Sequence, residues 1–393
     1  MKLRVAHIIT QLELGGAQQN TLYTVGHLNS DLYEPILICG PGGILDDEAK
    51  KGAWPTHFVR WLVRPVRPWK DVLALIAIYR LLREMKPHIA HTHSSKAGIL
   101  GRIAAYVAGV PVIIHTFHGF GFTPEQPDWL RAFYVWIEKC CAFLSTHLIF
   151  VSKDNEEEAA SLGIGKGKPA SLIRSGIVIQ EPPILSPLRE ELNIPTDAWV
   201  VVTVGNFKPQ KNPMDVVKTA KAVLEKEPQV HFLLVGDGEQ RAAVEHYVQI
   251  EGIASQIHFL GWRQDIYTVL AGANCFLLTS LWEGLPRALI EAAVARLPAV
   301  AYAVNGVKDI LKDDETGFPI PPHDTALAAE KILWLKNNPF EARRLGARAR
   351  AQVIKEFDID TMVRAQEELY EQLYAKVPLK EYYEPQWSLD KRG

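Results

Sequence analysis

The chain has 393 residues, more than one hydrophobic core usually serves, so two domains are expected. Apolar residues make up 48% and charged residues 22%, which is ordinary for a globular enzyme, and the net charge of −2 excludes a polycation built to bind nucleic acid. Residues 1–178 carry a net charge of +4, and the remaining residues carry −6. The basic N-terminal half either binds an anionic substrate or membrane surface or is basic by chance.

The cysteines and the apolar runs indicate a cytoplasmic protein. The four cysteines have no metal-ligand spacing, and the adjacency of Cys140 and Cys141 disfavours a disulfide between them, which is typical of a reducing compartment. The first 16 residues reach Glu13 without the long apolar run of a signal peptide. The stretch 71–85 is too short and too charged to span a bilayer.

Residues 1–180 alternate short apolar runs with segments of helical periodicity. The runs that predict strands are LRVAHII, YEPILICG, HIAHTHSS, PVIIHTFHGF and THLIFVS. The intervening segments predict helices, including one over 71–85 that Pro87 stops and another that begins at Lys96. This alternation is typical of βαβ units and predicts a parallel sheet in an N-terminal domain.

A proline-rich stretch, residues 181–197, predicts a linker, after which the alternation restarts. Residues 198–356 contain a second series of strand-like runs, namely WVVVTVG, VHFLLVG, IHFLG, CFLLTS, PAVAYAV and GFPIPP. Residues 357–393 hold one more helix and a tail rich in aromatic residues and prolines. We therefore expect an α/β fold of two doubly wound domains that face each other across a cleft, with ligands at the carboxyl ends of the strands.

Two glycine-containing turns follow predicted strands. Gly15 and Gly16 precede a predicted helix, so they indicate either an anion site at the helix N-terminus or a tight turn. Gly236 and Gly238 form a G-x-G after a strand but lack the third glycine of the dinucleotide fingerprint. For this second turn, an ordinary strand-to-helix connection is favoured over a cofactor loop.

Basic side chains gather at other strand ends. Lys208 and Lys211, in VGNFKPQKNP, can neutralise a diphosphate or can be solvated loop lysines. His91 and His93 have the spacing of one strand face, but a metal site needs convergent ligands, so a structural role is favoured and no metal is expected. His118 precedes a glycine that lets the backbone approach a ligand.

The segment 279–301 is mostly apolar but contains two glutamates, Glu283 and Glu291. A strand, a turn and a helix from about Arg287 to Arg296 are predicted, with Pro286 in the first turn. Free amides at the start of this helix can bind phosphate, and Glu291 on its second turn can accept hydrogen bonds from a ribose diol. Alternatively, Glu283 caps the helix and Glu291 is solvated.

Together these residues resemble the retaining glycosyltransferases of family 4, which have the GT-B fold. The resemblance runs from GGAQ to TGFPIPPHD, and its most specific part is SLWEGLPRALIEAAVARLP, with two glutamates separated by seven residues. The motifs HTHSSKAGILGR and HTFHGF resemble the subgroup that builds bacterial surface polysaccharides and lipid-linked oligosaccharides. The resemblance implies a nucleotide-sugar donor, with UDP favoured, on the C-terminal domain and a glycan or polyprenyl-linked acceptor on the N-terminal domain.

The resemblance also implies roles for individual residues. Glu291 would bind the ribose, Glu283 the donor sugar and Lys211 the diphosphate, while His118 would lie near the transferred sugar. The remaining donor contacts implied are Gly16 on the diphosphate, Gly284, Leu285 and Pro286 along the sugar and phosphates, and Gly261 and Trp262 around the base. His118, Lys211 and Glu283 would form the catalytic set.

Three positions depart from the family pattern. Asn206 stands where an arginine is common, so one positive charge on the diphosphate is missing unless Lys208 supplies it. Arg296 and Asn305 each stand where a glycine is usual. These departures bear on the geometry of the donor phosphates and leave the expected fold unchanged.

Retaining transfer in such a site would proceed by front-face attack, in which the departing phosphate takes the acceptor proton. No metal or cofactor would be needed, because Lys211 and a helix end would stabilise the negative charge of the leaving diphosphate. The last helix would return to the N-terminal domain. Two alternatives stay open: a nucleotide-sugar 2-epimerase of GT-B shape, and a non-catalytic nucleotide-sugar-binding protein. The basic and aromatic segment VRPVRPWK indicates either a peripheral contact with an anionic membrane or a solvated loop.

Overall fold

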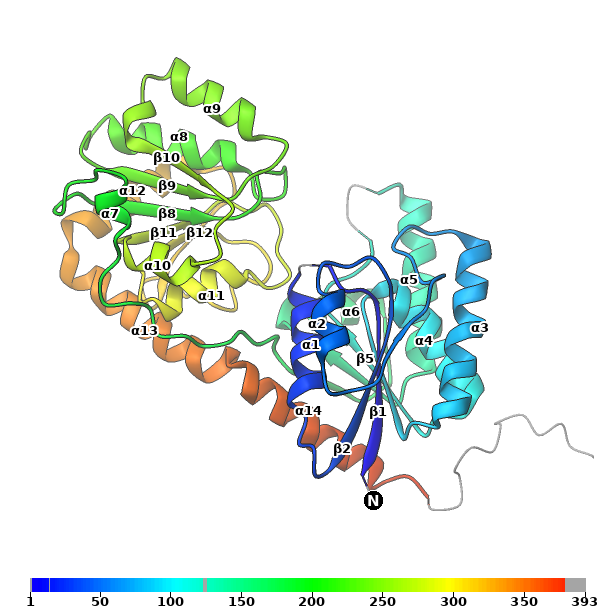
Figure 1. Ribbon diagram of the computed structural model, residues 1–393. Helices are drawn as coiled ribbons and strands as arrows, with labels where there is room; N and C mark the ends of the chain where they lie inside the picture. The colour runs from blue at the N-terminus through cyan, green and yellow to red at the C-terminus, as the bar shows by residue number, and fades with distance from the viewer. Residues whose placement is uncertain (1, 14, 123–125, 379–393) are drawn as a thin grey trace, which may run out of the picture. The chain divides into compact units, whose positions relative to one another are not determined.

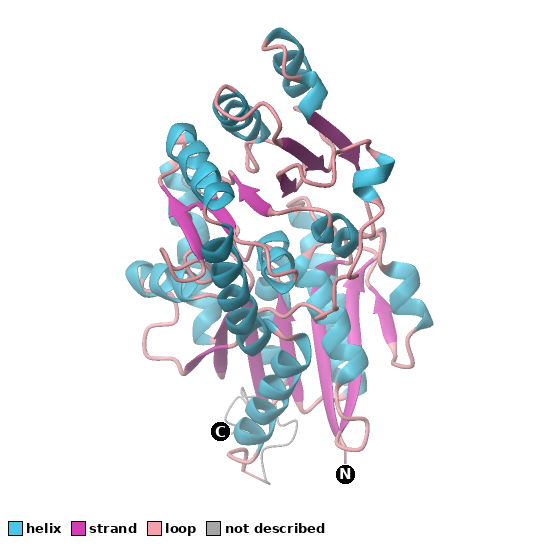
Figure 2. Ribbon diagram, turned by 90° about the vertical axis from the view of Figure 1, so that its left-hand side faces the viewer, coloured by secondary structure: helices cyan, strands magenta, loops and turns pink. Residues whose placement is uncertain are grey.

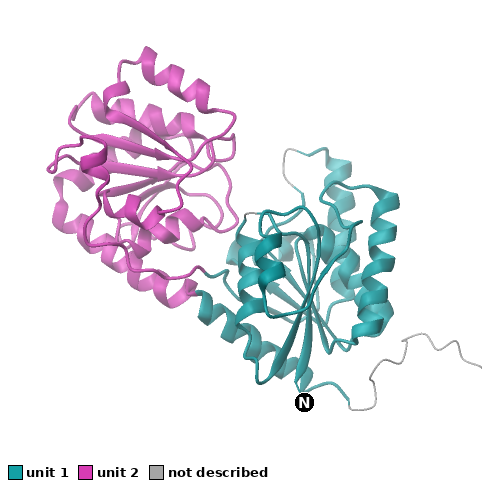
Figure 3. Cartoon of the chain, viewed as in Figure 1, with its two compact units in different colours: residues 1–176, 359–393 teal, residues 177–358 magenta. Residues whose placement is uncertain are grey.

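The computed structural model describes residues 2–13, 15–122 and 126–378, and the chain forms two compact units (Figure 3). Unit 1 comprises Met1–Gly176 and Ile359–Gly393, and unit 2 comprises Ile177–Asp358. The proline-rich stretch 181–197, predicted as a linker, belongs to unit 2. It contains the short helix α7 (Leu188–Glu191) and contributes the buried side chains of Leu188 and Ile194 to the unit 2 core.

Unit 1 contains a parallel sheet of seven strands in the order β3-β2-β1-β4-β5-β6-β7 (Figure 1). The strands are β1 (Leu3–Gln11), β2 (Tyr33–Gly40), β3 (Thr56–Phe58), β4 (Ile89–His93), β5 (Val112–Phe117), β6 (His147–Phe150) and β7 (Ala170–Leu172). The helices are α1 (Gly16–His27), α2 (Asp46–Lys51), α3 (Pro68–Met85), α4 (Ser95–Ala108), α5 (Asp128–Phe143), α6 (Lys153–Leu162) and α14 (Ile359–Tyr374).

Alternate residues of β1 divide the unit 1 helices between the two faces of the sheet. Ala6 and Ile8 pack with α3 and α4, whereas Val5 packs with α14 and Ile9 packs with α1 and α2. Because side chains alternate along a strand, residues 5, 7 and 9 share one face. The last helix, α14, therefore completes the core of unit 1, since Met362, Val363 and Tyr370 are buried there.

Unit 2 contains a parallel sheet of six strands in the order β10-β9-β8-β11-β12-β13. The strands are β8 (Val200–Val204), β9 (His231–Val235), β10 (Ile257–Gly261), β11 (Cys275–Leu278), β12 (Ala299–Tyr302) and β13 (Gly317–Ile320). The helices are α7, α8 (Pro213–Leu224), α9 (Arg241–Ile250), α10 (Ile266–Ala271), α11 (Arg287–Val294), α12 (Thr325–Asn337) and α13 (Pro339–Phe357).

Helices cover both faces of the unit 2 sheet as well (Figure 2). One core cluster joins the sheet to α7, α10, α11 and α13, and another joins it to α8, α9 and α12. The expected α/β architecture with two doubly wound parallel sheets is confirmed. In both units the strand order reverses beside the first strand, between β1 and β4 and between β8 and β11, and ligands of such sheets bind outside the strand ends at this point.

No helix among the described residues combines the length and the apolar character that a membrane span requires. The helix predicted from about Arg287 to Arg296 ends earlier, at Val294, because Arg296 adopts a left-handed backbone conformation with φ of 61° that an α-helix does not accommodate.

Candidate functional site

The loops that follow β8 and β11 meet at the reversal point of the unit 2 sheet. The Leu281 amide donates to the Gln210 carbonyl (2.8 Å), and the Gln210 side chain donates in return to the Trp282 carbonyl (2.9 Å). The Thr279 hydroxyl donates to the carbonyl of Lys211 (3.1 Å). These bonds tie the lysine-bearing loop directly to the loop that carries the first glutamate.

Lys211 and Glu283, two of the predicted catalytic residues, form an ion pair in which Lys211 Nζ donates to Glu283 Oε1. The Glu283 side chain is only 6% exposed, whereas 21% of the Lys211 side chain remains accessible. The lysine is thus oriented by a carboxylate beneath it and can still reach a ligand. The sequence interpretation placed both residues in one site but assigned Glu283 to the sugar and did not foresee that it would position Lys211.

Glu291 lies on α11, beyond the turn formed by Gly284, Leu285 and Pro286. Its side chain is 19% exposed, and burial raises the pKa of its carboxyl, an effect that Arg287 at 3.8 Å partly opposes. Pro286 occupies the N-cap of α11, and no side chain caps the helix there. The backbone amides at this end are therefore free of a side-chain acceptor, as an anion site requires.

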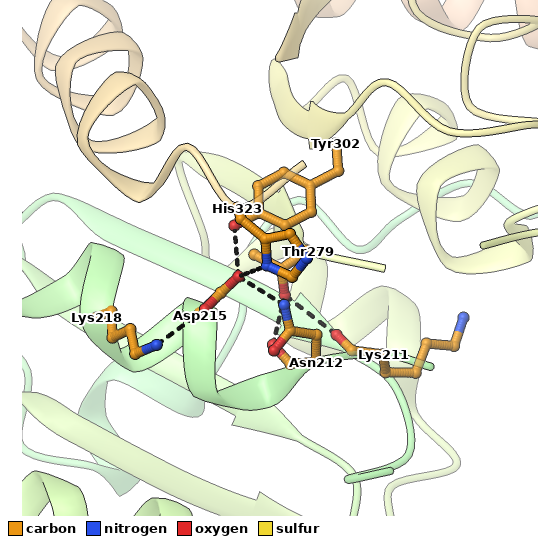
Figure 4. A network of polar contacts seen from close by, with 7 residues as sticks. All are labelled: Lys211, Asn212, Asp215, Lys218, Thr279, Tyr302 and His323. Carbon is orange, nitrogen blue, oxygen red and sulfur yellow. Dashed lines mark hydrogen bonds and ion pairs between the residues drawn. The ribbon is translucent and has the colours of Figure 1, made fainter. Parts of the chain in front are cut away.

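A buried carboxylate, Asp215, supports the turn that carries Lys211 (Figure 4). Its Oδ2 accepts hydrogen bonds from Asn212 Nδ2 (2.6 Å), the Tyr302 hydroxyl (2.9 Å) and His323 Nδ1 (3.0 Å), and Lys218 lies 3.4 Å from its Oδ1. Burial by itself raises the pKa of the Asp215 carboxyl, but these hydrogen bonds outweigh it and hold the pKa below its usual value.

Sequence reasoning missed this network. The signal that could have found it is the spacing of Asn212 and Asp215 around the start of α8, because an N-cap polar residue followed three positions later by an acidic residue marks a helix start. Asn212 itself adopts a left-handed backbone conformation, with φ of 47°, which asparagine tolerates better than most residues.

The turns after β8, β9 and β10 pack backbone against backbone. A Cβ at Gly236 would lie 2.0 Å from the Gly205 carbonyl oxygen, and the Gly236 amide donates to the Gly261 carbonyl (2.8 Å). A Cβ at Gly238 would lie 2.6 Å from the Phe207 carbonyl oxygen. Close packing of these turns therefore explains the G-x-G motif, in agreement with the favoured interpretation of an ordinary connection.

Several predicted donor contacts lie on these packed turns. Asn206 and Lys208 follow β8, and Asn206 is exposed while Lys208 is half-buried. Gly261 ends β10, and Trp262 next to it is 66% exposed. The fold brings the strand ends of β8, β9 and β10 together, so these residues share one edge of the unit 2 sheet with Lys211.

The remaining predicted residues, Gly16 and His118, belong to unit 1. Gly16 begins α1 at the end of the β1 loop, and the N-cap Gly15 offers no side-chain acceptor to the first amides. His118 follows β5 directly and is partly exposed. Each therefore lies at the carboxyl edge of the unit 1 sheet, where the sequence placed it.

His91 and His93 share a strand face, as their spacing indicated, and a third histidine, His7, joins them from β1. Ring nitrogens of these three buried histidines lie within 4.8 Å of one another. However, His91 bonds the Tyr370 hydroxyl (2.6 Å) and the Thr116 hydroxyl (2.7 Å), and its ring centre lies 4.2 Å from that of His93, with the two rings tilted by 37°. Hydrogen bonds thus engage both ring nitrogens of His91, which favours the structural role.

Comparison with known proteins identifies the family. A model described as Glycosyl transferase 4-like domain matches residues 15–171, and one described as Glycosyl transferases group 1 matches residues 186–352. The UDP-Gal:alpha-D-GlcNAc-diphosphoundecaprenol alpha-1,3-galactosyltransferase of Escherichia coli is 34% identical over 330 residues, which cover 82% of this chain and 85% of the relative. The chain is a family 4 glycosyltransferase with the GT-B fold.

Further matches agree with this assignment. The capsular polysaccharide biosynthesis glycosyltransferase CapM of Staphylococcus aureus is 23% identical over 325 residues, covering 78% of this chain and 82% of the relative. The crystal structure of Anabaena Alr3699/HepE in complex with UDP has the same fold, with a TM-score of 0.80 at 20% identity over 95% of this chain and all of that chain. The family and the GT-B fold expected from the sequence are confirmed.

The structure shows the backbone conformation or packing around two of the residues that depart from the family 4 pattern. Arg296, in place of the usual glycine, has φ of 61°, the backbone region that favours glycine. Asn305 is exposed, and the neighbouring Gly306 is the residue that packing requires to be glycine, because a Cβ there would lie 2.2 Å from the Gly284 carbonyl oxygen. The turn between Glu283 and α11 is therefore supported despite the missing glycine at 305.

Proposed function

We propose that this glycosyltransferase moves a sugar from a UDP-sugar, with retention of configuration, to a polyprenyl-diphosphate-linked or glycan acceptor in surface glycan synthesis. The name of the Escherichia coli relative supports both substrates, because that enzyme takes UDP-Gal and a diphosphoundecaprenol-linked sugar. The complex of Anabaena Alr3699/HepE with UDP supports the nucleotide. The observation in this chain that carries the proposal is the Lys211–Glu283 pair beside the uncapped start of α11.

The proposed donor roles follow from charge and position. Lys211 binds the diphosphate as an oriented cation, and the α11 amides add a second positive field at the same turn. Glu291, four residues into α11, accepts hydrogen bonds from the ribose diol. Glu283 contacts the donor sugar through the carboxylate oxygen that Lys211 does not use. Gly16 and His118 act from unit 1 on the diphosphate and the sugar.

The proposed chemistry needs stabilisation of the leaving diphosphate above all. The bond between the anomeric carbon and the phosphate oxygen breaks, the acceptor oxygen bonds to that carbon on the same face, and the acceptor proton moves to the departing phosphate oxygen. Charge accumulates on the diphosphate during this step, so a preorganised cation lowers the barrier. We propose that Lys211 supplies this charge without a metal, and turnover should then be unchanged by excess EDTA.

Donor binding tests the proposal directly. UDP-, GDP- and ADP-sugars should be screened for thermal stabilisation, and we expect the UDP-sugars to raise the melting temperature most, because a ligand that binds only the native state stabilises it by mass action. Calorimetry with UDP should then show affinity lost in Glu291→Ala and kept in Glu330→Ala, an exposed glutamate on α12. Unchanged affinity in Glu291→Ala would refute the ribose assignment.

Product analysis separates transfer from the two alternatives. Incubation with a UDP-sugar and a polyprenyl-diphosphate-linked acceptor should release UDP and elongate the acceptor. A 2-epimerase would convert the UDP-sugar into its 2-epimer without net release of UDP, and a binding protein would leave the UDP-sugar unchanged.

A peripheral contact with an anionic membrane forms part of the proposal, and two helices of unit 1 support it. On α5 the side chains of Trp129, Phe133, Trp136 and Phe143 form one exposed stripe, with exposures of 72%, 49%, 60% and 72%. The opposite face of α5 is anchored, since Glu138 pairs with the buried Arg102 of α4 at 2.6 Å. An apolar stripe that faces solvent on an anchored helix is typical of an interaction surface.

Helix α3 presents a second stripe of the same kind, formed by Trp69, Val72, Leu73 and Ile76. Both helices pack against α4, and a pocket of about 690 Å³ is lined from α3 and its preceding loop and from α5. We call the two stripes together the α3–α5 surface, and Phe133 is the stripe residue that lines this pocket.

Basic residues border the α3–α5 surface. Arg64 and Arg67 are exposed in the loop before α3, and Lys70 Nζ lies 5.4 Å from the centre of the Trp69 ring. Tryptophans flanked by cations suit the headgroup level of an anionic bilayer, where the rings enter the interface and the cations meet phosphates. A lipid-linked acceptor would be presented at the same level.

Flotation with vesicles of phosphatidylcholine and phosphatidylglycerol tests this contact. We expect the wild type to float with anionic vesicles at low salt and the double variant Trp129→Ser/Trp136→Ser to stay in solution. The matched control is Ile44→Ser/Phe340→Ser, which removes two side chains of 77% and 78% exposure outside the α3–α5 surface and should float normally. Equal flotation of both double variants, or none by the wild type, would refute the contact.

A further inference from the structure

Three histidines of unit 1 form a chain of hydrogen bonds that reaches His118. His7 Nδ1 lies 3.2 Å from His93 Nε2, and His93 Nδ1 lies 3.3 Å from His118 Nε2. The three rings come from β1, β4 and the turn after β5, and His7 and His93 are 0% and 3% exposed. The predicted catalytic histidine is therefore connected to two residues in the interior of the sheet.

All three rings are neutral at physiological pH. Burial lowers the pKa of His7 to about 3 and that of His118 to about 4, and burial together with the neighbouring histidines lowers the pKa of His93 well below its usual value. A neutral imidazole has one ring N–H and one acceptor nitrogen. The two hydrogen bonds must therefore run in one direction along the whole chain, either from His7 to His118 or in reverse.

The far end of the chain decides this direction. His7 Nε2 is buried and has no hydrogen-bond partner among the described residues. If the chain ran from His118 to His7, this atom would carry the proton, and orphaned N–H groups are rare in protein interiors. In the other direction His7 Nδ1–H donates to His93 Nε2, His93 Nδ1–H donates to His118 Nε2, and only an acceptor lone pair is left unmatched.

We propose that His7 and His93 are positioning residues that fix His118 as the Nδ1–H tautomer, so that the ring meets its ligand as a neutral hydrogen-bond donor. His118 Nε2 is then occupied by the His93 proton and cannot accept one from a substrate. Nδ1 already carries its proton, so neither ring nitrogen serves as a general base. This role fits a reaction in which the leaving phosphate itself accepts the acceptor proton, and that link rests on the proposed function.

A small cavity beside the chain supplies an independent reason for a donor at this place. It has about 10 Å³, close to the space that one water molecule needs, and His93 and His118 line it with Asn20 and Thr24 of α1. Asn20 Oδ1 and Thr24 Oγ1 are buried without hydrogen-bond partners among the described residues. Asn20 Oδ1 is thus an unmatched acceptor beside the chain, and the Thr24 hydroxyl can either accept or donate.

Nitrogen NMR of histidine-labelled full-length protein measures the tautomer directly, with His118→Gln assigning the signal. At pH 7 we expect wild-type His118 to carry its proton on Nδ1. His93→Asn should keep this tautomer, because the asparagine amide nitrogen can replace Nδ1 as the donor to His118. His93→Leu should remove the donor and release His118 to the Nε2–H form.

The matched control is His115→Gln, which alters another buried histidine of β5 whose ring bonds Thr92 on the opposite face of the sheet. We expect it to leave the His118 tautomer as in the wild type. If His93→Leu does not fold, the His118 tautomer can still be tested. The spectra of the wild type and of His7→Phe, which removes the donor to His93, then provide the test. A wild-type His118 protonated on Nε2, or charged at pH 7, would overturn the proposal.

Turnover provides the second readout. UDP release should fall about 3- to 10-fold in His93→Leu, the equivalent of one neutral hydrogen bond, and recover most of that loss in His93→Asn. An unchanged His118 tautomer in a folded His93→Leu variant would refute the positioning role. Absence of sugar transfer by the wild type would instead count against the proposed function, and the tautomer measurement would be unaffected.

Discussion

The two units share a strand order but place opposite chemistry at the point where that order reverses. In unit 2 the loops after β8 and β11 hold the ion pair of Lys211 with Glu283, and Asp215 in the first turn of α8 accepts hydrogen bonds from three side chains. In unit 1 the equivalent edge holds the hydroxyls of Thr10 and Ser94, which lie 2.8 Å apart, and the histidine chain, and an ion pair joins Lys96 to Asp71 at 2.6 Å.

This difference shows that topology selects the place of a site and that the residues ending the strands select its chemistry. In unit 2 the Lys211 side chain is paired with Glu283 and is still 21% exposed, so it can contact an anionic ligand. The imidazoles of unit 1 are buried and stay neutral because charging them without an anionic partner would be costly. Four perturbations test this contrast, from the largest expected effect to the smallest.

Acid should destabilise unit 1 far more than unit 2. His7, His91, His93 and His115 are at most 3% exposed, and burial lowers the pKa of each. The unfolded chain binds their protons near pH 6.5, whereas the folded chain resists protonation, so this stability is present above that pH and is lost as the pH falls. Because the pKa of His7 falls to about 3, this imidazole should cost about 2 kcal/mol of the free energy of unfolding at pH 5, and the other three should add to the loss.

Native-state hydrogen exchange at pH 7 and pH 5, corrected for intrinsic exchange rates, can follow both units. Amides of β1 and β4 should lose protection more than those of β8 and β9, because His231 and His258 in unit 2 are only half-buried. His115→Asn should reduce the loss in unit 1. An equal loss of protection in the two units would contradict the contrast.

Removing the positive charge of Lys211 in unit 2 should lower the rate of catalysis. Lys211→Ala should lower kcat about 100-fold, as for the loss of a transition-state charge partner, and should leave Glu283 buried without its cation. Lys226→Ala, at an exposed lysine after the end of α8, is the control and should have a much smaller effect. A near-normal kcat in Lys211→Ala would remove the lysine from the mechanism.

Removing Asp215, which supports the turn that carries Lys211, should above all lower the stability of the protein. Asp215→Ala would leave the buried Tyr302 hydroxyl and the Asn212 amide without their acceptor, and we expect a loss of about 2 kcal/mol in the free energy of unfolding. Urea denaturation measures it. Lys218→Ala, which removes only the exposed partner at 3.4 Å, should cost less than about 0.5 kcal/mol. Similar losses in the two variants would mean that the buried hydrogen bonds are not what holds the turn.

The smallest effect concerns the backbone after α11. Arg296→Gly should stabilise unit 2 by about 0.5–1 kcal/mol, because glycine adopts φ of 61° without the steric cost that arginine pays there. Thermal unfolding should show a higher melting temperature with unchanged UDP affinity. Arg343→Gly, at an exposed position inside α13, should destabilise the protein instead, and stabilisation by both substitutions would refute the backbone explanation.

Local pattern was enough to predict much of this molecule. The alternation of apolar runs and helical segments predicted both parallel sheets, and the incomplete G-x-G correctly favoured a plain turn at Gly236 and Gly238. The helix expected after Pro286 is also confirmed as α11. These inferences succeeded because they depend on neighbouring residues, whose periodicity and backbone freedom are visible in the sequence. The anion site expected at the free amides of this helix start stays a prediction.

Contacts between distant residues were outside the reach of that reasoning. Lys211 and Glu283 are separated by 72 positions, and Asp215 meets Tyr302 and His323 across 87 and 108 positions. The three histidines of the unit 1 chain come from β1, β4 and the turn after β5, and His7 carried no local signal at all. Register and strand order bring these groups together, and neither is encoded by spacing along the chain.

The sequence by itself therefore determined the two doubly wound folds, the family and the strand ends at which chemistry is expected. Only the tertiary structure decided which charge orients Lys211, which carboxylate supports its turn and which imidazoles reach His118. The physical reason is that secondary structure follows from local periodicity, whereas ion pairs and hydrogen-bond chains depend on burial and on the packing of distant segments.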